Sequence, residues 1–312
     1  MLTSLNLPGG IVGHGFPTFG LPVFTTGTTF FVQSTGANAS NDPRRGKSPS
    51  QPFSSIDYAV GQCTANAGDV IVVMPGHVET VTAAAGLDLD VAGITLIGVG
   101  SGSLRPQINF TTAVGADMDV DAANITICNF LFTGGIDALT GPIDVNAADC
   151  KLFNIETRDV TGQATDFIVT DATCDRLMID GWRHGGAAAA GADTAISIVG
   201  GDWIQIRNFS IDGNFAVAGI ENVTTAATNL HIGGGHAINY IRTRNAADIA
   251  ITLVATATGN VGPNIMIRLQ DDAANITECL VGADMQFFDP IMVCNADGER
   301  GLQYNGATSA DL

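Results

Sequence analysis

A six-residue string, DAANIT, occurs twice in this chain, at Asp121–Thr126 and at Asp272–Thr277. Looser copies of the same form (polar, small, small, polar, apolar) start at Asp90, Asn146, Asp171, Val199, Thr225 and Asn245. Successive starts lie about 26 residues apart on average, which is the period of a repeat architecture. We therefore expect one structural unit that the chain builds many times.

The copies lie between short runs in which apolar and polar residues alternate with the period of a β-strand. Clear examples are Leu87–Val91 and Met118–Ala122 before a copy, and Ile125–Ile127 and Trp203–Ile206 after one. Gly, Asn, Thr and Asp interrupt every window in which apolar residues could follow helical spacing. The unit is thus strand, tight turn, strand, looser turn, and helical solenoids are disfavoured.

Stacking such units predicts an all-β solenoid, a parallel β-helix in which each strand pairs with its equivalent one coil away. Eight or nine coils would give a rod roughly 40 Å long. The small residues of the repeated string suit a corner where the backbone turns sharply. Inward side chains should form two columns: Leu87, Met118 and Ile143 in one, and Leu89, Val120 and Val145 in the other.

Composition agrees with one elongated domain, because 312 residues with 46% apolar side chains can bury a substantial core. Among the six cysteines, Cys128, Cys150 and Cys174 fall at or near strand positions of successive coils, which predicts reduced thiols that fill the core. No Cys or His spacing suggests a zinc site, and we expect no cofactor. The net charge of -18 argues against nucleic acid as a partner.

Residues 1–29 form a distinct segment rich in Gly and Pro, with Phe16, Phe19 and Phe24 and no charged side chain. The segment lacks an apolar run long enough for a secretory signal or a membrane span, so we expect synthesis in the cytoplasm and no membrane partner. It is apolar but too broken to form a regular element. Two interpretations stay open: the arm plugs the end of its own β-helix, or it docks on another subunit or protein.

The next segment is expected to cap the solenoid. Phe30–Gln33 reads as a strand and Gly36–Pro52 as a polar loop. Ser54 or Ser55 would then cap a short helix, and Val70–Met74 reads as a buried strand. The apolar face of that helix would hold Ile56, Ala59, Val60 and Cys63. The predicted organisation is an arm at 1–29, a cap and first coil at 30–80, coils at 81–290 and a C-terminal cap or tail at 291–312.

The loop SPSQPF at Ser48–Phe53 and the strand GDVIVVMPG at Gly68–Gly76 resemble the entry segment of right-handed parallel β-helix proteins of the pectate-lyase-like superfamily. With the coils, the resemblance covers about residues 30–290. It implies a right-handed parallel β-helix with a short N-terminal capping helix. It leaves function open, because the fold carries lyases, hydrolases, tailspikes and virion proteins.

Hydrolases of this superfamily use two or three close Asp residues, and two carboxylates must flank the scissile bond. Here Asp271 and Asp272 lie late in the chain, and the one Gly-His-Gly, at Gly13–Gly15, lies in the arm. Their order does not match the hydrolase pattern, so we predict no catalytic residues. We likewise predict no cofactor-binding and no metal-binding residues.

Acidic side chains repeat on three coils, where Asp88, Asp119 and Asp144 should take equivalent outward positions. Asp90, Asp121 and Asn146 follow beside them. Such a ladder either binds a divalent cation or stays solvated, and the solvated form is favoured.

Aromatic side chains that could line a sugar groove are few. Trp182 and His184 could mark one surface pocket, whereas Trp203 is expected to pack within a coil. The five histidines are scattered, and a structural or solvent role is favoured for each: His14, His77, His184, His231 and His236.

The arm, the acidic composition and the missing catalytic set favour a structural virion protein, a capsid decoration or cement protein of a tailed bacteriophage. The overall plan is similar to β-helix proteins of such phages. That hypothesis places the protein on the capsid surface as a homotrimer, with the arm on the major capsid protein or another virion subunit and a host glycan as a further partner. The alternative is a polysaccharide-binding or polysaccharide-degrading β-helix of the tailspike, lyase or hydrolase type. A surface adhesin is the third hypothesis and is the least favoured.

Overall fold

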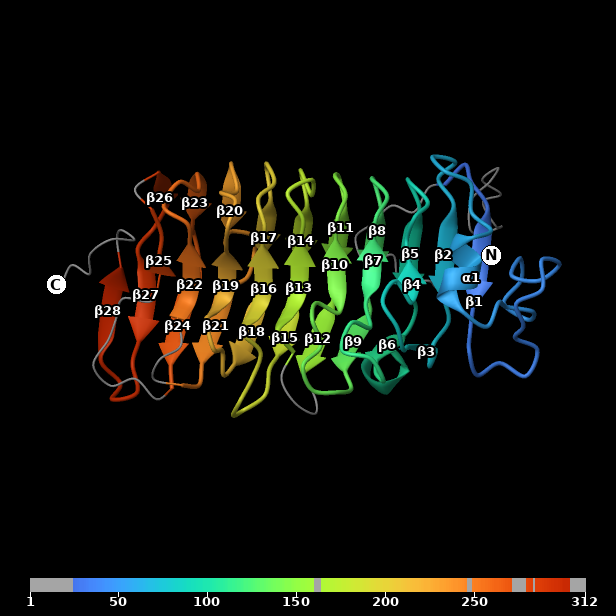
Figure 1. The fold of residues 1–312 in the computed structure, drawn as a ribbon, viewed down its shortest axis with the longest axis horizontal. Helices are drawn as coiled ribbons and strands as arrows, with labels where there is room; N and C mark the ends of the chain where they lie inside the picture. The colour runs from blue at the N-terminus through green and yellow to red at the C-terminus, as the bar shows by residue number, and fades with distance from the viewer. Residues whose placement is uncertain (1–24, 160–163, 246–248, 271–278, 283, 304–312) are drawn as a thin grey trace, which may run out of the picture.

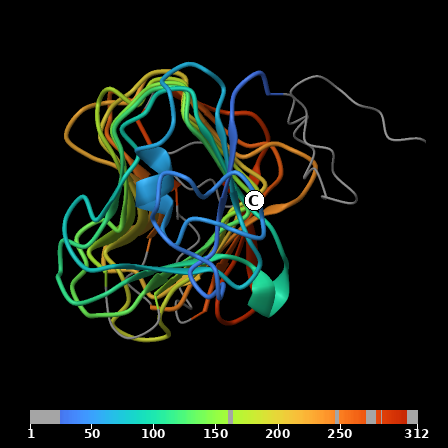
Figure 2. The same cartoon turned by 90° about the vertical axis from the view of Figure 1, so that its right-hand side faces the viewer.

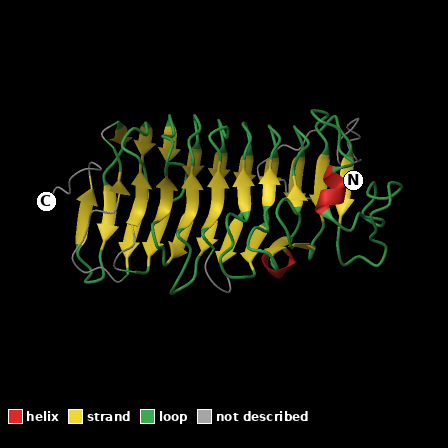
Figure 3. Cartoon of the chain, in the orientation of Figure 1, coloured by secondary structure: helices red, strands yellow, loops and turns green. Residues whose placement is uncertain are grey.

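A computed structural model of the chain describes residues 25–159, 164–245, 249–270, 279–282 and 284–303. It shows a parallel β-helix, a rod of stacked coils with three strands in most coils (Figures 1 and 3). The strands form three sheets that run along the rod, which we name sheets A, B and C in the order the chain visits them. Adjacent strands pair in parallel except at the C-terminal end of sheet B. The predicted all-β solenoid is confirmed.

Sheet A contains ten strands: β1 (Thr29–Val32), β2 (Val70–Val73), β5 (Thr95–Gly98), β8 (Thr126–Cys128), β11 (Lys151–Phe153), β14 (Met178–Asp180), β17 (Gln205–Arg207), β20 (Leu230–Ile232), β23 (Gly259–Val261) and β26 (Met285–Phe287). Sheet B contains ten: β3 (Val78–Val81), β6 (Gln107–Phe110), β9 (Leu131–Gly134), β12 (Glu156–Asp159), β15 (Arg183–Gly185), β18 (Ser210–Gly213), β21 (Asn239–Thr243), β24 (Ile265–Leu269), β27 (Ile291–Cys294) and β28 (Arg300–Gln303). Sheet C contains eight: β4 (Leu87–Asp88), β7 (Met118–Val120), β10 (Ile143–Val145), β13 (Asp166–Thr170), β16 (Thr194–Ile198), β19 (Ala218–Asn222), β22 (Ile249–Leu253) and β25 (Cys279–Leu280).

The core fills the inside of the coils, and both predicted columns lie there. Leu87, Met118 and Ile143 pair in register, and all three are fully buried, as are Leu89, Val120 and Val145. Cysteines join the same core as small apolar fillers, and burial raises the pKa of the Cys128 and Cys174 thiols to about 11. No disulfide joins cysteines in the described part of the chain.

The repeated string forms the corner between sheet C and sheet A. One residue at the tip of each corner adopts a left-handed conformation, and its N–H donates to the carbonyl that precedes the equivalent residue of the next coil. At the last tip, Asn229, the N–H donates to Thr258 Oγ1 instead. Asn, Asp and Gly suit this conformation because other side chains crowd the backbone there. The stacked tips are Asn66, Gly93, Asn124, Asp149, Arg176, Trp203 and Asn229.

One copy of the string does not belong to this corner. The copy that begins at Asn245 precedes β22 of sheet C, whereas the earlier copies follow a sheet C strand. The second DAANIT, Asp272–Thr277, falls between β24 and β25 in sequence and lies outside the described residues. Treating all copies as equivalent was therefore wrong, because small polar residues suit any tight corner of a coil.

A short helix covers the N-terminal end of the core. Helix α1 (Ile56–Val60) begins after the cap residue Ser55, whose hydroxyl accepts a hydrogen bond from the Tyr58 N–H. The helix packs against β1, β2 and β4, and the end view in Figure 2 shows it across the opening of the coils. A short 3₁₀ helix, η1 (Gly102–Leu104), lies in the loop after β5. The predicted capping helix is confirmed.

Buried His77 fixes this cap to the first coil. Its Nδ1 accepts a hydrogen bond from the Ser34 N–H at 2.9 Å, and its Nε2 lies 2.8 Å from Glu79 Oε2. The same carboxylate oxygen accepts from the Ile56 N–H at 2.9 Å, at the start of α1. A histidine with a structural role was predicted at this position. The arm at 1–29 lies outside the described residues except for its last five positions.

The C-terminal end closes differently, because β28 turns back and pairs antiparallel with β27. Ten strands in sheet A, spaced about 4.8 Å apart, give a rod roughly 43 Å long. In the part of the chain that the structure describes, no helix is long and apolar enough to cross a membrane.

Candidate functional site

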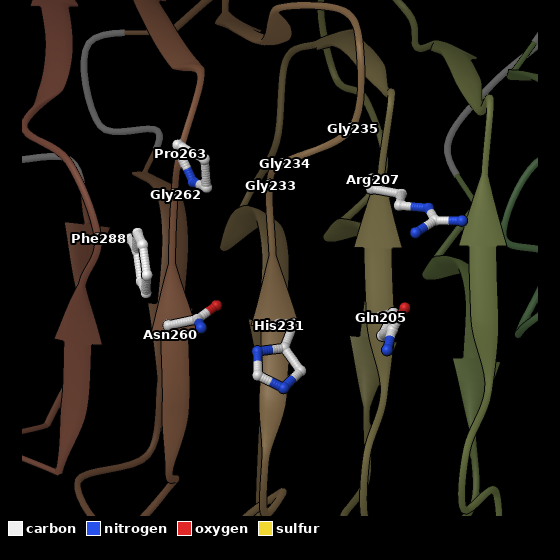
Figure 4. A pocket seen from close by; sticks show the side chains of 10 residues that line it. All are labelled: Gln205, Arg207, His231, Gly233, Gly234, Gly235, Asn260, Gly262, Pro263 and Phe288. Carbon is white, nitrogen blue, oxygen red and sulfur yellow. The ribbon is translucent and has the colours of Figure 1, made fainter.

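Four neighbouring strands of sheet A carry a row of amide and imidazole side chains on the outer face of the rod. Gln205, His231, Asn260 and Gln286 are register partners on β17, β20, β23 and β26. Because adjacent strands lie about 4.8 Å apart, these side chains form a ladder with that spacing. Figure 4 shows the first three of them side by side. We call these four residues the polar row.

A shallow hollow of about 350 Å³ lies beside the polar row. Gly233, Gly234, Gly235 and Gly262 line it without side chains, and it lies between Arg207 and Phe288 (Figure 4). Gly235 has a positive φ of 86°, and a Cβ there would overlap the side chain of Asn208. The Phe288 ring is 67% exposed, so an apolar face is available to a ligand at the C-terminal side of the hollow.

A second hollow of about 290 Å³ adjoins the first through Gln205, which lines both. Its other lining residues are Arg176, Leu177, Met178 and Trp203. The Trp203 indole is 51% exposed, and its ring centre lies 5.9 Å from that of His231. The two hollows and the polar row thus form one continuous surface with an aromatic side chain near each end.

Trp203 occupies a backbone position that a bulky residue rarely adopts. Its φ is 59°, at a corner tip where the neighbouring coils carry Arg176 and Asn229. A left-handed conformation costs about 1–2 kcal/mol for a residue with a crowded side chain. An indole that is half exposed recovers little of this cost by packing. Strained, exposed residues of this kind cluster at functional sites.

The predictions for the two tryptophans were the wrong way round. Trp182 and His184, expected at a surface pocket, are each 1% exposed and lie inside the coil. The Trp182 Nε1–H donates to Thr157 Oγ1 at 2.9 Å, and His184 Nδ1 lies 2.9 Å from the same oxygen. Burial among the rings of Phe167 and Phe215 lowers the pKa of His184 to about 4.

The signal that places Trp203 outside is present in the sequence. In Trp203-Ile-Gln-Ile206, the buried Ile204 and Ile206 alternate with Trp203 and Gln205, which face outward, and this alternation is visible in the sequence. Trp203 was expected in the core because a large indole usually packs there, and this expectation was given more weight than the alternation. The pattern of the run is the better guide, because neighbouring coils fix the direction of every position in it.

The arginines beside the two hollows are paired with carboxylates. Arg176 donates from Nε and from a terminal nitrogen to the two oxygens of Asp149, at 2.7 and 2.8 Å. Hydrogen bonds from this guanidinium lower the pKa of Asp149 below its ordinary value. Arg207 Nε donates to Asp180 at 2.9 Å, and Figure 4 shows the guanidinium turned away from Gly233.

The outer face of sheet C carries the predicted carboxylate ladder. Asp88 pairs with Asp119, and Asp119 pairs with Asp144, so the three side chains stack on adjacent strands as expected. Asn146 donates to Asp121 at 2.9 Å beside the ladder. Partial burial and neighbouring carboxylates raise the pKa of Asp119 to about 7. The same two causes raise the pKa of Asp88.

The described residues contain no group of three or more His, Cys, Asp or Glu side chains arranged to hold a metal ion. Asp271, Asp272 and the Gly13–Gly15 motif lie outside the described residues, so the structure does not place them.

A scan against protein-family models finds no match, and a search of curated proteins also finds none. Among solved structures, a rhamnogalacturonan lyase is similar, with a TM-score of 0.45 and 13% sequence identity. That similarity covers 80% of this chain and 75% of the lyase chain. The strand pairing of the described residues defines the fold of this protein.

Proposed function

We propose that this protein is a carbohydrate-binding β-helix that holds a polysaccharide on the outer face of sheet A. The observation that carries the proposal is Trp203, half exposed and strained beside the polar row. Ligand sites combine aromatic faces with a few polar groups that fix orientation. An indole offers an apolar face to a sugar ring, and amides both donate to and accept from sugar hydroxyls.

The shape of the surface favours a polymer over a single sugar. The polar row runs across the strands and therefore along the rod axis (Figure 1). Trp203 lies beside its first member, Gln205, and Phe288 directly follows β26, the last strand of the row. Three strand spacings, roughly 14 Å in all, separate the two ends of the row. An extended chain that lies along the axis can contact both aromatic rings at once.

Binding without cleavage fits the chemistry of this face. Glycoside hydrolysis needs two carboxyl groups on either side of the scissile bond. None of the described residues that line the two hollows is Asp or Glu. The carboxylate ladder lies on a different sheet, so a chain held by the polar row does not lie between those side chains.

The test compares retention of the wild type and of Trp203→Ala on a panel of immobilised polysaccharides, with reducing ends measured in parallel. We expect the wild type to be retained on at least one polysaccharide without release of new reducing ends. Trp203→Ala should lose that retention, while Val114→Ala, which shortens an exposed apolar side chain outside the two hollows, should keep it. Equal retention of Trp203→Ala and wild type would exclude this surface as the site.

The virion hypothesis remains a prediction. It rests on the acidic composition, the missing catalytic set and the arm at 1–29, of which the described residues include only the last five. Capsid attachment, the capsid-surface location and the homotrimer are expected outcomes of co-sedimentation and light-scattering measurements on full-length protein and on a variant that starts at Phe30. A glycan-binding rod is compatible with that hypothesis, because a virion protein that projects from a capsid can also contact a host glycan.

A further inference from the structure

We infer that the sheet A surface takes a neutral glycan and discriminates against acidic ones. This inference rests on the proposed function and names the substrate class of the same site. It follows from the pairing of the two arginines that line the hollows, Arg176 and Arg207, with carboxylates of the protein itself. Acidic polysaccharides are recognised through arginine or lysine side chains that offer hydrogen bonds to a carboxylate.

The first arginine at the surface, Arg176, already uses its Nε and one terminal nitrogen to bind the carboxylate of Asp149. Its two bonds to Asp149, at 2.7 and 2.8 Å, form the bidentate geometry that a ligand carboxylate would need. A ligand carboxylate would therefore have to displace Asp149. Lys151 also acts on Asp149, whose pKa is lowered first by the Arg176 hydrogen bond and to a smaller degree by this ammonium.

The second arginine is held in a similar way. Arg207 Nε donates to Asp180 Oδ2 at 2.9 Å, and one terminal nitrogen lies 3.7 Å from the sulfur of Met178. Asn208 donates to the other oxygen of Asp180 at 2.6 Å, which fixes the carboxylate in place. Both oxygens of Asp180 are thus engaged, and the guanidinium lies toward β14 and away from the glycine-lined hollow (Figure 4).

Further carboxylates surround the surface and would repel an anion. Asp202, next to Trp203, accepts hydrogen bonds from Thr228 and Asn229 that lower its pKa, so it is ionised at neutral pH. The chain as a whole carries a net charge of -18. Among the residues that line the two hollows, the groups that remain for a ligand are the indole, the amides, the imidazole and the Phe288 ring, and they suit the hydroxyls and ring faces of a neutral sugar. The exposed Lys151 is the register partner of Met178 and lies one strand outside this lining.

The test measures binding to a glycan array that contains neutral polysaccharides such as dextran and galactomannan and acidic ones such as polygalacturonate, at low and at physiological ionic strength. We expect the wild type to bind neutral members at least about tenfold more tightly than acidic members, a difference of about 1.4 kcal/mol. Trp203→Ala should lose the neutral binding.

Two isosteric variants test the role of the paired arginines directly. Each removes the carboxylate that holds one guanidinium, that of Arg176 or that of Arg207. Asp149→Asn and Asp180→Asn keep the shape of the side chain, and Asn suits the left-handed backbone at 149 as it does at Asn124 and Asn229. Both variants should gain salt-sensitive binding to polygalacturonate. The control Asp90→Asn removes the same charge from the sheet C side, where no arginine is released, and should gain none.

The possible failures are distinguishable. If the wild type binds acidic members as tightly as neutral ones and loses both through Trp203→Ala, the proposed function stands and the neutral preference is wrong. If no member binds, or if binding does not depend on Trp203, the proposed function fails together with the preference. If Asp90→Asn gains polygalacturonate binding as strongly as the other two variants, net charge rather than the paired arginines sets the selectivity, and the inference is overturned.

Discussion

Sheet A and sheet C present outer faces of different chemistry, although the same pairing register builds both. On sheet A, register stacks Gln205, His231 and Asn260 on successive strands. On sheet C, it stacks Asp88, Asp119 and Asp144 in the same manner. In each case a side chain that points outward finds its equivalent one strand spacing away on either side.

The physical consequence depends on what is repeated. Partial burial, together with repulsion between carboxylates at this spacing, raises the pKa of Asp119, so this side chain holds its proton more tightly. Amides and imidazoles at the same spacing do not repel, and they leave donors and acceptors directed to solvent. A β-helix thus repeats one kind of side chain at a fixed spacing along its axis. Repeated charge costs stability, and repeated amides make a surface suited to a repeating ligand.

The largest effect on glycan affinity is expected when one of the two aromatic side chains of the sheet A surface is removed. Trp203→Ala and Phe288→Ala should each weaken binding of a long neutral polysaccharide by about 2 kcal/mol, roughly thirtyfold, as for an interface hot spot. A short oligosaccharide that reaches one ring only should lose affinity through one of the two variants. Calorimetry with oligosaccharides of increasing length checks this result. Equal losses from both variants at every length would contradict an axial binding mode.

The next prediction concerns Trp203→Asn, a substitution expected to change glycan affinity and the free energy of unfolding in opposite directions. Trp203→Asn places at the corner tip the residue type that neighbouring coils use, Asn124 and Asn229. Relief of the left-handed strain should raise the free energy of unfolding by about 1 kcal/mol, while glycan binding is lost. Chemical denaturation gives the stability change. A variant that is less stable than wild type would show that the indole is held by packing instead.

The sheet C ladder predicts a pH dependence of stability. The pKa of Asp119 rises from its ordinary 3.8 to about 7 on folding, so the native state holds this proton more tightly than the unfolded chain. Its stabilising contribution is fully present below about pH 4 and is lost as pH rises to 7. Asp119→Asn should therefore stabilise the protein above pH 7 by about 1 kcal/mol, a value reduced for the partial solvation of the carboxyl.

The measurement is denaturant unfolding of wild type and Asp119→Asn at pH 5 and pH 8, the two sides of the titration near 7. The difference between the two proteins isolates this group from Asp159, whose pKa is also raised, to about 6. Asp90→Asn serves as the control, since its side chain is exposed beside the ladder. An equal gain from Asp90→Asn would attribute the effect to net charge.

The smallest expected effect concerns a single member of the polar row. Asn260→Ala should weaken glycan binding by about 0.5–1 kcal/mol, the net value of one hydrogen bond, and leave stability nearly unchanged. Thr252→Ala is the matched control on the outer face of sheet C and should leave binding at the wild-type level. Titration calorimetry with the best glycan from the array distinguishes the two.

The sequence alone was sufficient to predict the fold. Alternation around the repeated string identified strands, their columns of Leu87 and Leu89 equivalents, the helix after Ser55 and the register of the carboxylate ladder. These features are encoded locally, because alternation fixes which side chains face inward and the repeat fixes which positions pair. The repeat pattern did not distinguish the corner before a sheet C strand from the corner after one. The copy at Asn245 was therefore expected after a sheet C strand, although it precedes β22.

Only the tertiary structure identified the candidate site. Residue type suggested Trp182 for the surface and Trp203 for the core, and the coil placed them the other way round. The polar row joins residues more than twenty positions apart in sequence, and the pairing of Arg176 with Asp149 crosses from one coil to the next. Sequence fixes what each coil carries, but the chemistry of a face depends on which side chains adjacent coils bring into contact.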